Sequence, residues 1–122
     1  MPLDWATGYP AGVGLRRLCD ATMRRNAIQP EIVRLFTVLA AESLQPSHPA
    51  HAYFTGRQEM AAAAYTALGW QLTDQPDQLA RQIMAMMDGL QIQWLRNLET
   101  TDLVQEWETA AEALFARFSR AA

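Results

Sequence analysis

The segment 76–98 carries more apolar surface than one buried helix face requires, and this excess constrains the fold more than any other feature. At 100° per residue its apolar side chains cover roughly half of the helix circumference, beyond the ~100° arc that suffices for a surface helix. The central stripe consists of Leu79, Ile83, Met86, Leu90 and Trp94. Such a helix must be covered on two sides.

The segment 103–120 follows after a break at residues 99–102 and shows a second apolar pattern. Its large apolar side chains alternate at spacings of three and four residues, as in a heptad seam that packs on a partner helix. Two such neighbouring helices predict a homodimer in which the last two helices of each copy form an intermolecular four-helix bundle. The predicted interface is Leu79, Ile83, Met86, Leu90, Val104, Trp107, Ala111, Leu114 and Phe118.

Composition bounds the class of protein. A chain of 122 residues, half of them hydrophobic, is expected to fold as one domain with a packed core. The single cysteine, Cys19, excludes an intrachain disulfide and a multi-cysteine metal site, so we expect a reducing, cytoplasmic location. No signal sequence opens the chain and no apolar run approaches the ~20 residues that span a bilayer, so no membrane partner is expected.

The charge balance argues against a free-standing nucleic-acid-binding domain. The formal net charge is −3, whereas such domains concentrate basic residues on one face to displace counterions from phosphates. Two arginine pairs, Arg16 with Arg17 and Arg24 with Arg25, are the basic clusters, and Asp20 lies between them. A solvated helix face is favoured over a phosphate-binding patch here.

Periodicity and punctuation predict five helices and no strand, which is an all-α, five-helix bundle. We expect an irregular lead-in over residues 1–13 and one helical effector-binding and dimerisation domain over residues 14–122. The predicted helices span 11–26, 30–44, a segment capped by Ser47 that ends at Gly69, 76–98, and 103–120 with Asp102 as its cap. The second is expected to bury Ile32, Val33, Leu35, Phe36 and Leu39.

Three stretches resemble the C-terminal domain of tetracycline-repressor-like (TetR-family) transcriptional regulators. They are the run PEIVRLFTVLAAES at 30–43, HPAH at 48–51 and DGLQIQWL at 88–95. The similarity extends over residues 14–118, and the octet at 88–95 is its most specific part. The resemblance implies a helical domain that binds a small effector between its earlier helices and dimerises through its last two. Ligand binding would shift helix packing and thereby change the separation of two DNA-reading modules.

One feature departs from the family pattern. Family members read operator DNA through an N-terminal helix-turn-helix module, and residues 1–14 are too few to form two helices joined by a tight turn. We therefore expect operator binding only through a module that this sequence does not contain.

Few residues indicate chemistry, so we expect neither an enzyme nor a cofactor. His48 and His51 could share one side of a helix start near Glu42, but a metal site needs a further committed ligand, and histidines bonded to nearby backbone are the favoured interpretation. Cys19 lies mid-helix on an apolar face, as a small buried hydrophobe does. No phosphate-binding glycine loop or nucleophile elbow is present.

Arg57 is the polar side chain that is hardest to place. It falls within the apolar stripe of its helix, next to Gly56, and an arginine facing a core needs an anion. The structural interpretation is an ion pair with Glu42 or extension of the head group to the rim. The functional interpretation is that Arg57 orients an acidic or polar effector.

The predicted effector is a small apolar or amphipathic molecule, because flexible methionine side chains suit such sites. The candidate ligand-binding residues are Met23, Phe36, Leu39, Phe54, Arg57, Met60, Met84, Met87 and Trp94. The alternative is a helical homodimeric scaffold or interaction module without an effector, which predicts a filled core. An enclosed cavity of several hundred cubic ångströms would favour sensing.

Overall fold

The computed structural model describes residues 13–120, which form five α-helices and no strand. The helices are α1 (Val13–Ala27), α2 (Pro30–Glu42), α3 (His51–Gly69), α4 (Pro76–Arg96) and α5 (Leu103–Phe118). The prediction of an all-α fold with five helices is confirmed. Of the lead-in predicted for residues 1–13, all but Val13, which begins α1, lies outside the described residues.

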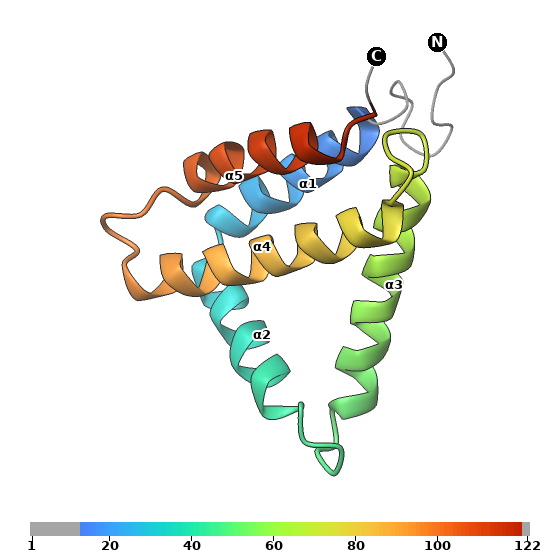
Figure 1. Ribbon diagram of the computed structural model, residues 1–122. Coiled ribbons are helices and arrows are strands. Elements are labelled where there is room, and N and C mark those ends of the chain that lie inside the picture. Colours follow the sequence, from blue (N-terminus) through green and yellow to red (C-terminus); the bar gives the residue numbers. More distant parts are fainter. Residues whose placement is uncertain (1–12, 121–122) are drawn as a thin grey trace.

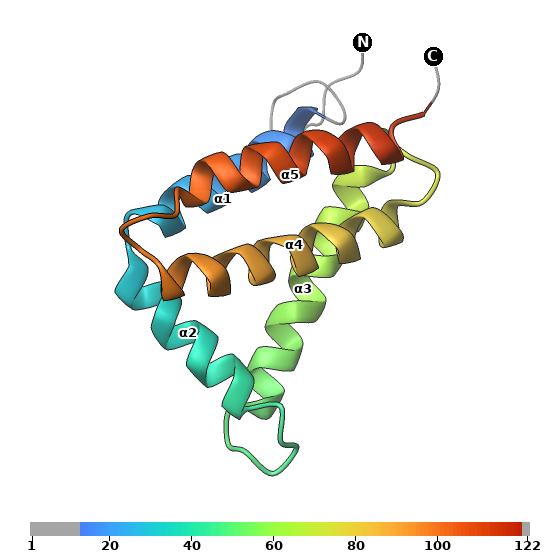
Figure 2. The same ribbon diagram turned by 60° about the vertical axis from the view of Figure 1, so that its left-hand side comes forward.

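The helices form two groups that differ in how many large side chains they bury. α4 packs against α3 and α5, and α1 packs against α5, whereas α2 makes few contacts with any neighbour. Figures 1 and 2 show α1 and α5 side by side along one edge of the molecule, with α2 and α3 extending from α4 like the sides of a triangle. We call α1, α4 and α5 the three-helix core, and α2 with α3 the α2–α3 pair.

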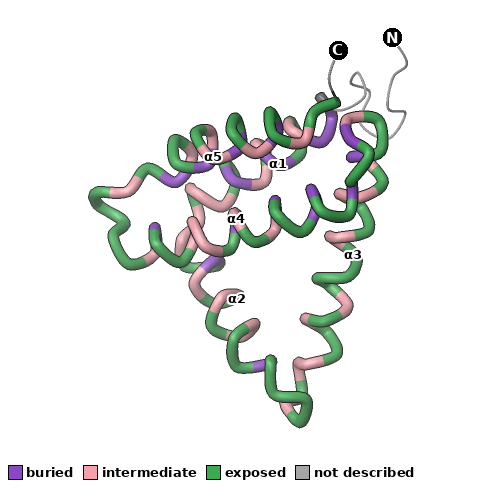
Figure 3. Tube along the Cα trace, viewed as in Figure 1, coloured by how far each residue is buried: buried purple, intermediate pink, exposed green. Residues whose placement is uncertain are grey.

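Most of the buried residues belong to the three-helix core, as the purple segments of Figure 3 show. By contrast, α2 buries only Val33 and α3 buries only Gly69. The fully or almost fully buried side chains of the three-helix core are Leu15, Cys19, Met23, Leu79, Ala80, Ile83, Trp94, Leu103, Trp107 and Ala111. The hydrophobic free energy that stabilises the fold is therefore concentrated in three of the five helices.

This core corrects part of the predicted dimer seam. Leu79, Ile83, Trp107 and Ala111 have no solvent-exposed surface in the single chain, so they have none to place against a second copy. α3 and α5 cover the broad apolar arc of α4. The other predicted seam residues, Met86, Leu90, Val104, Leu114 and Phe118, are partly exposed.

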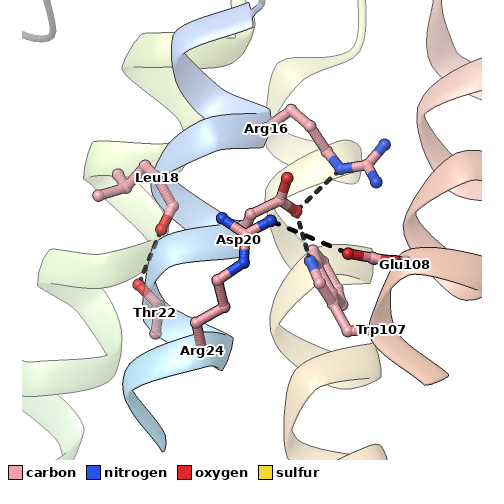
Figure 4. Close-up of polar contacts among 7 residues, drawn as sticks. All are labelled: Arg16, Leu18, Asp20, Thr22, Arg24, Trp107 and Glu108. Atoms are coloured by element: carbon pink, nitrogen blue, oxygen red, sulfur yellow. Dashed lines mark hydrogen bonds and ion pairs between the residues drawn. The ribbon is translucent and has the colours of Figure 1, made fainter. Parts of the chain in front are cut away.

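A cluster of polar side chains at the edge of the core joins α1 to α5 (Figure 4). The Oδ1 atom of Asp20 accepts hydrogen bonds from Arg16 Nε at 2.9 Å and from the indole nitrogen of Trp107 at 2.8 Å. Arg24 lies 3.9 Å from Glu108 on the same side of the helix pair. Because the indole N–H of a fully buried tryptophan needs an acceptor, Asp20 fixes how Trp107 enters the core.

The helix ends follow the sequence signals in part. Pro30 and Pro76 occupy the first positions of α2 and α4, and the Asp102 side chain accepts a hydrogen bond from the Gln105 backbone N–H at 3.1 Å, as predicted. The predicted Ser47 cap is wrong. Residues 43–50 form turns, and α3 begins at His51 with Ala50 as its N-cap and no side-chain cap.

Gly69 ends α3 as predicted, and its main contribution is space. A Cβ atom at this position would lie 3.3 Å from Pro76 Cβ and 3.8 Å from Leu15 Cδ2. The missing side chain lets the end of α3 approach both the start of α4 and the buried face of α1.

The end of the described chain returns to the α3–α4 loop. Arg120 was expected in the last turn of α5, but that helix ends at Phe118. Its guanidinium instead donates to Asp74 Oδ1 at 2.8 Å and to the carbonyl oxygens of Trp70 and Thr73 at 2.9 and 3.1 Å. Arg120 thereby ties the C-terminal end of α5 to this loop.

Candidate functional site

A cleft of about 770 Å³ lies between α2, α3 and α4, with the end of α1 as its fourth wall. It arises because α2 and α3 approach each other at the 43–50 turn and are spread apart where they meet the three-helix core (Figure 1). Its apolar lining includes Val33, Phe36, Phe54, Met84 and Met87. The volume and lining are those of small-molecule binding sites, which span ~300–1,000 Å³.

The cleft brings together Phe36, Phe54, Arg57, Met84 and Met87 from the predicted ligand-binding set. The remaining predicted residues do not line it. Met23 and Trp94 are buried in the three-helix core, Met60 is 76% exposed, and Leu39 is half-buried on another side of α2. Helical periodicity gives each side chain's direction but not the place where two helices separate, and this limited the prediction.

An aromatic cluster closes the cleft between α2 and α3. The rings of Phe36 and Phe54 meet edge to face with centroids 6.1 Å apart, and Tyr53 lies 5.1 Å from Phe54. The guanidinium carbon of Arg57 lies 4.5 Å from the centre of the Phe36 ring, which is a cation–π contact. The predicted ion pair of Arg57 with Glu42 does not form among the described residues, so the Phe36 ring holds the guanidinium at the cleft wall.

Asp88 of α4 places a carboxyl group in the same cleft. Desolvation by the surrounding walls raises its pKa above the ordinary value of 3.8, and the positive charge of Arg57 partly opposes that rise. The Asp88 residue is nevertheless exposed, as expected of a group in an open cleft. The two charges therefore influence each other across the cleft without forming an ion pair.

Tyr65 and Arg25 are two further polar residues that line the cleft. Burial first, and then the charges of Cys19 and Asp88, raise the pKa of the Tyr65 hydroxyl to about 12, while Arg25 lowers it. Tyr65 therefore stays a neutral phenol with a hydroxyl that can donate. A hydrogen bond of 2.5 Å from Asn26 to the side-chain oxygen of Gln91 joins α1 to α4 at this end of the cleft.

The two histidines bond to nearby backbone, as the favoured interpretation predicted. The Ala50 backbone N–H donates to His48 Nδ1 at 3.0 Å, and His51 Nδ1 lies 2.7 Å from the Ser43 carbonyl oxygen. Across residues 13–120, no three histidine, cysteine or acidic side chains gather as metal ligands. The second bond ties α3 to the end of α2 at the cleft rim.

Cys19 is a buried core residue, as predicted. Burial, and next the charge of Asp20, raises the pKa of its thiol to about 12. At neutral pH the side chain is therefore a protonated thiol, which is a poor nucleophile and a poor metal ligand.

Asp88, Tyr65, Gln91 and Arg25 line the cleft but were not predicted from the sequence. A signal for Asp88 and Gln91 was present, because they follow Met84 and Met87 at intervals of four and lie on the same side of α4. Polar residues at helical spacing beside an apolar arc indicate a wet cleft rather than a dry core. Arg25 gave no such signal, since its neighbours in the sequence are polar.

A comparison of the chain with protein-family models, curated proteins and solved structures gives no match. Within residues 13–120, no helix has the length and hydropathy required to cross a bilayer.

Proposed function

We propose that this chain is the effector-binding and dimerisation domain of a TetR-like transcriptional regulator, in which the cleft between α2, α3 and α4 receives a small amphipathic molecule. The cleft is the observation that carries this proposal. It combines about 770 Å³ of space with an apolar lining and several convergent polar groups, as ligand sites do. The proposal assigns no chemical reaction to this site.

A scaffold without an effector is the competing function, and it predicts that the space between the helices is filled. The space between α2, α3 and α4 is not filled, which supports sensing, but it is an open cleft and not the enclosed cavity that would be the stronger sign. A screen of apolar and acidic small molecules by thermal denaturation tests the choice. A ligand at 100 times its dissociation constant adds about 2.7 kcal/mol to the free energy of unfolding, so a true effector raises the melting temperature measurably.

A matched pair of variants localises any hit from that screen. Ala61→Phe places a ring in the cleft, whereas Ala113→Phe adds the same ring on the exposed side of α5. The ligand-induced rise in melting temperature should be lost in the first variant and kept in the second. A library that stabilises nothing, or a hit that Ala61→Phe leaves unchanged, contradicts the proposal.

We propose that the chain dimerises through those residues of the predicted interface on α4 and α5 that are partly exposed in the single chain. These side chains are Met86, Leu90, Val104, Leu114 and Phe118. Sedimentation equilibrium at micromolar concentration should report a dimer, and Leu114→Asp should weaken it by about 100-fold or more, because a charge replaces a buried leucine.

A second apolar surface supplies the control for this experiment. Leu35 and Val38 of α2 are each about half exposed and do not line the cleft, so they are the alternative contact surface. Leu35→Asp should leave the dimer intact. A monomeric wild-type chain, or a dimer that dissociates in Leu35→Asp and persists in Leu114→Asp, would overturn the assignment to α4 and α5.

α4 connects the two proposed activities, because Met84 and Met87 line the cleft while Met86 and Leu90 lie on the proposed dimer surface. A ligand acts only through its different affinities for two packing arrangements. Linkage then requires that the ligand changes the dimer dissociation constant by the same factor by which dimerisation changes ligand affinity. Measuring both factors tests the mechanism by which ligand binding would reach paired DNA-reading modules.

A further inference from the structure

The charged groups of the cleft have a sign opposite to that of the whole chain. Arg25 of α1 and Arg57 of α3 contribute two positive charges, and Asp88 of α4 contributes one negative charge at most. The complete sequence has a formal net charge of −3. A concave site with an excess of positive charge on a negative protein concentrates anions.

Arg57 is also held in a position to receive an anion. The guanidinium carbon of the exposed Arg57 lies over the Phe36 ring, and no hydrogen bond or ion pair joins Arg57 to any other described residue. A guanidinium has five N–H donors in a rigid fork that matches a carboxylate in bidentate geometry. Its donors have no partner among the described residues, and Phe54 and Met84 line the same cleft.

We propose that the ligand of the cleft is an amphipathic carboxylate, with its head group bound by Arg57 and its apolar body packed between Phe36, Phe54, Met84 and Met87. This inference rests on the proposed sensing function and specifies the chemical class of the effector. Methionine and phenylalanine side chains accept alkyl and aryl bodies of varied shape. The head group supplies the selectivity because it pairs with the stacked guanidinium.

The charged and titratable groups around Asp88 determine how ligand affinity changes with pH. Arg57 of α3 lowers the pKa of the Asp88 carboxyl, Asp88 raises the pKa of Tyr65 of α3, and Arg25 of α1 lowers the pKa of Tyr65. A ligand carboxylate at Arg57 adds a negative charge beside Asp88, and like charges favour protonation of one of the two. Binding should therefore take up protons, and carboxylate affinity should rise as pH falls toward the raised pKa of Asp88.

Three probes with one alkyl chain and different head groups test the inference by calorimetry on the whole chain: decanoate, decanol and decylamine. Decanoate should bind at least about tenfold more tightly than decanol, as expected for one charge-assisted pair, and decylamine should bind most weakly. If decanol or decylamine equals or exceeds decanoate, the head-group assignment is overturned while the sensing function stands. If none of the three binds, both fail.

Arg57→Met tests the residue, with Arg81→Met as its matched control because Arg81 is exposed on α4 outside the cleft. The first variant should lose the tenfold preference for decanoate and keep its affinity for decanol, whereas the second should keep both. A preference that survives in Arg57→Met overturns the assignment of Arg57.

Asp88→Asn gives an independent test, also usable where Arg57→Met does not fold. It should strengthen decanoate binding at pH 8 and abolish proton uptake, because no carboxyl remains there to be protonated. Decanoate affinity that is unchanged by Asp88→Asn and independent of pH in the wild-type chain overturns the placement of the head group between Arg57 and Asp88.

Discussion

The three-helix core and the α2–α3 pair use apolar side chains in opposite ways. α1, α4 and α5 bury theirs against one another, down to fully enclosed residues such as Trp107 and Ile83. α2 leaves Ile32, Leu35 and Val38 about half exposed, and the inner sides of α2 and α3 face a cleft instead of a core. The first group therefore supplies stability, while the second supplies a surface on which a ligand can bind.

Trp107→Ala should have the largest effect on this contrast. Removing a fully buried indole leaves a cavity and leaves Asp20 without one of its donors, so the free energy of unfolding should fall by about 3–5 kcal/mol. Phe36→Ala, in the cleft wall, should lower it by less than about 2 kcal/mol because its ring is only partly buried. Equal losses in urea denaturation would remove the distinction between the two groups.

Two isoleucines on α4 provide a comparison within one helix. Ile83 is 0% exposed and Ile92 is 44% exposed. Ile83→Ala should therefore lower the free energy of unfolding by about 2–5 kcal/mol, and Ile92→Ala by less than about 1 kcal/mol. If urea denaturation shows a larger loss of unfolding free energy for Ile92→Ala than for Ile83→Ala, the side of α4 assigned to the core is wrong.

Arg120→Ala tests how much the contacts between the end of α5 and the α3–α4 loop contribute to stability. The side chain makes three hydrogen bonds to the α3–α4 loop, one of them part of an ion pair with Asp74, but it is substantially exposed. We expect thermal denaturation to report a loss of about 1 kcal/mol. Arg117→Ala, in the last turn of α5, should change stability by less than about 0.5 kcal/mol. Similar values for both variants would show that the tether contributes nothing.

Asp88→Asn should give the smallest effect, and its sign depends on pH. The raised pKa means that the folded state holds the Asp88 proton more tightly than the unfolded chain does, so ionisation of Asp88 lowers stability as pH rises above about 3.8. At pH 7 the variant should be more stable, by less than about 1 kcal/mol because the carboxyl keeps contact with solvent. The gain should vanish below the ordinary pKa.

The exposed loop residue Glu99 provides the control, since Glu99→Gln should show no such pH-dependent gain. A loss of stability at pH 7 in Asp88→Asn would mean that the ionised carboxylate is stabilised in the cleft.

Local signals in the sequence predicted the helices well. Pro30, Pro76 and Asp102 mark helix starts through fixed φ or a capping oxygen, and both effects act within a few residues of the chain. The Ser47 prediction failed because the His48 ring and the Ser43 carbonyl oxygen take part in a turn that delays α3 to His51. The hydrogen bonds of this turn join residues that a capping motif does not specify.

The partners of each apolar face were harder to predict. The surplus on α4 correctly indicated cover on two sides, but α3 and α5 of the same chain supply that cover for Leu79 and Ile83. The reverse error occurred in α2, where Ile32 and Leu35 were expected to be buried. Periodicity measures how much of a helix is apolar, while the crossing of helices decides which part is covered.

Methyl NMR of methionines during a decanoate titration tests the central claim, that small molecules bind in the cleft. The chain has six methionines, which include Met84 and Met87 in the cleft, Met23 in the core and the exposed Met60. We predict saturable shifts of the Met84 and Met87 methyl signals, with those of Met23 and Met60 unmoved. Shifts confined to Met60, or an unchanged spectrum at saturating decanoate, would contradict the account.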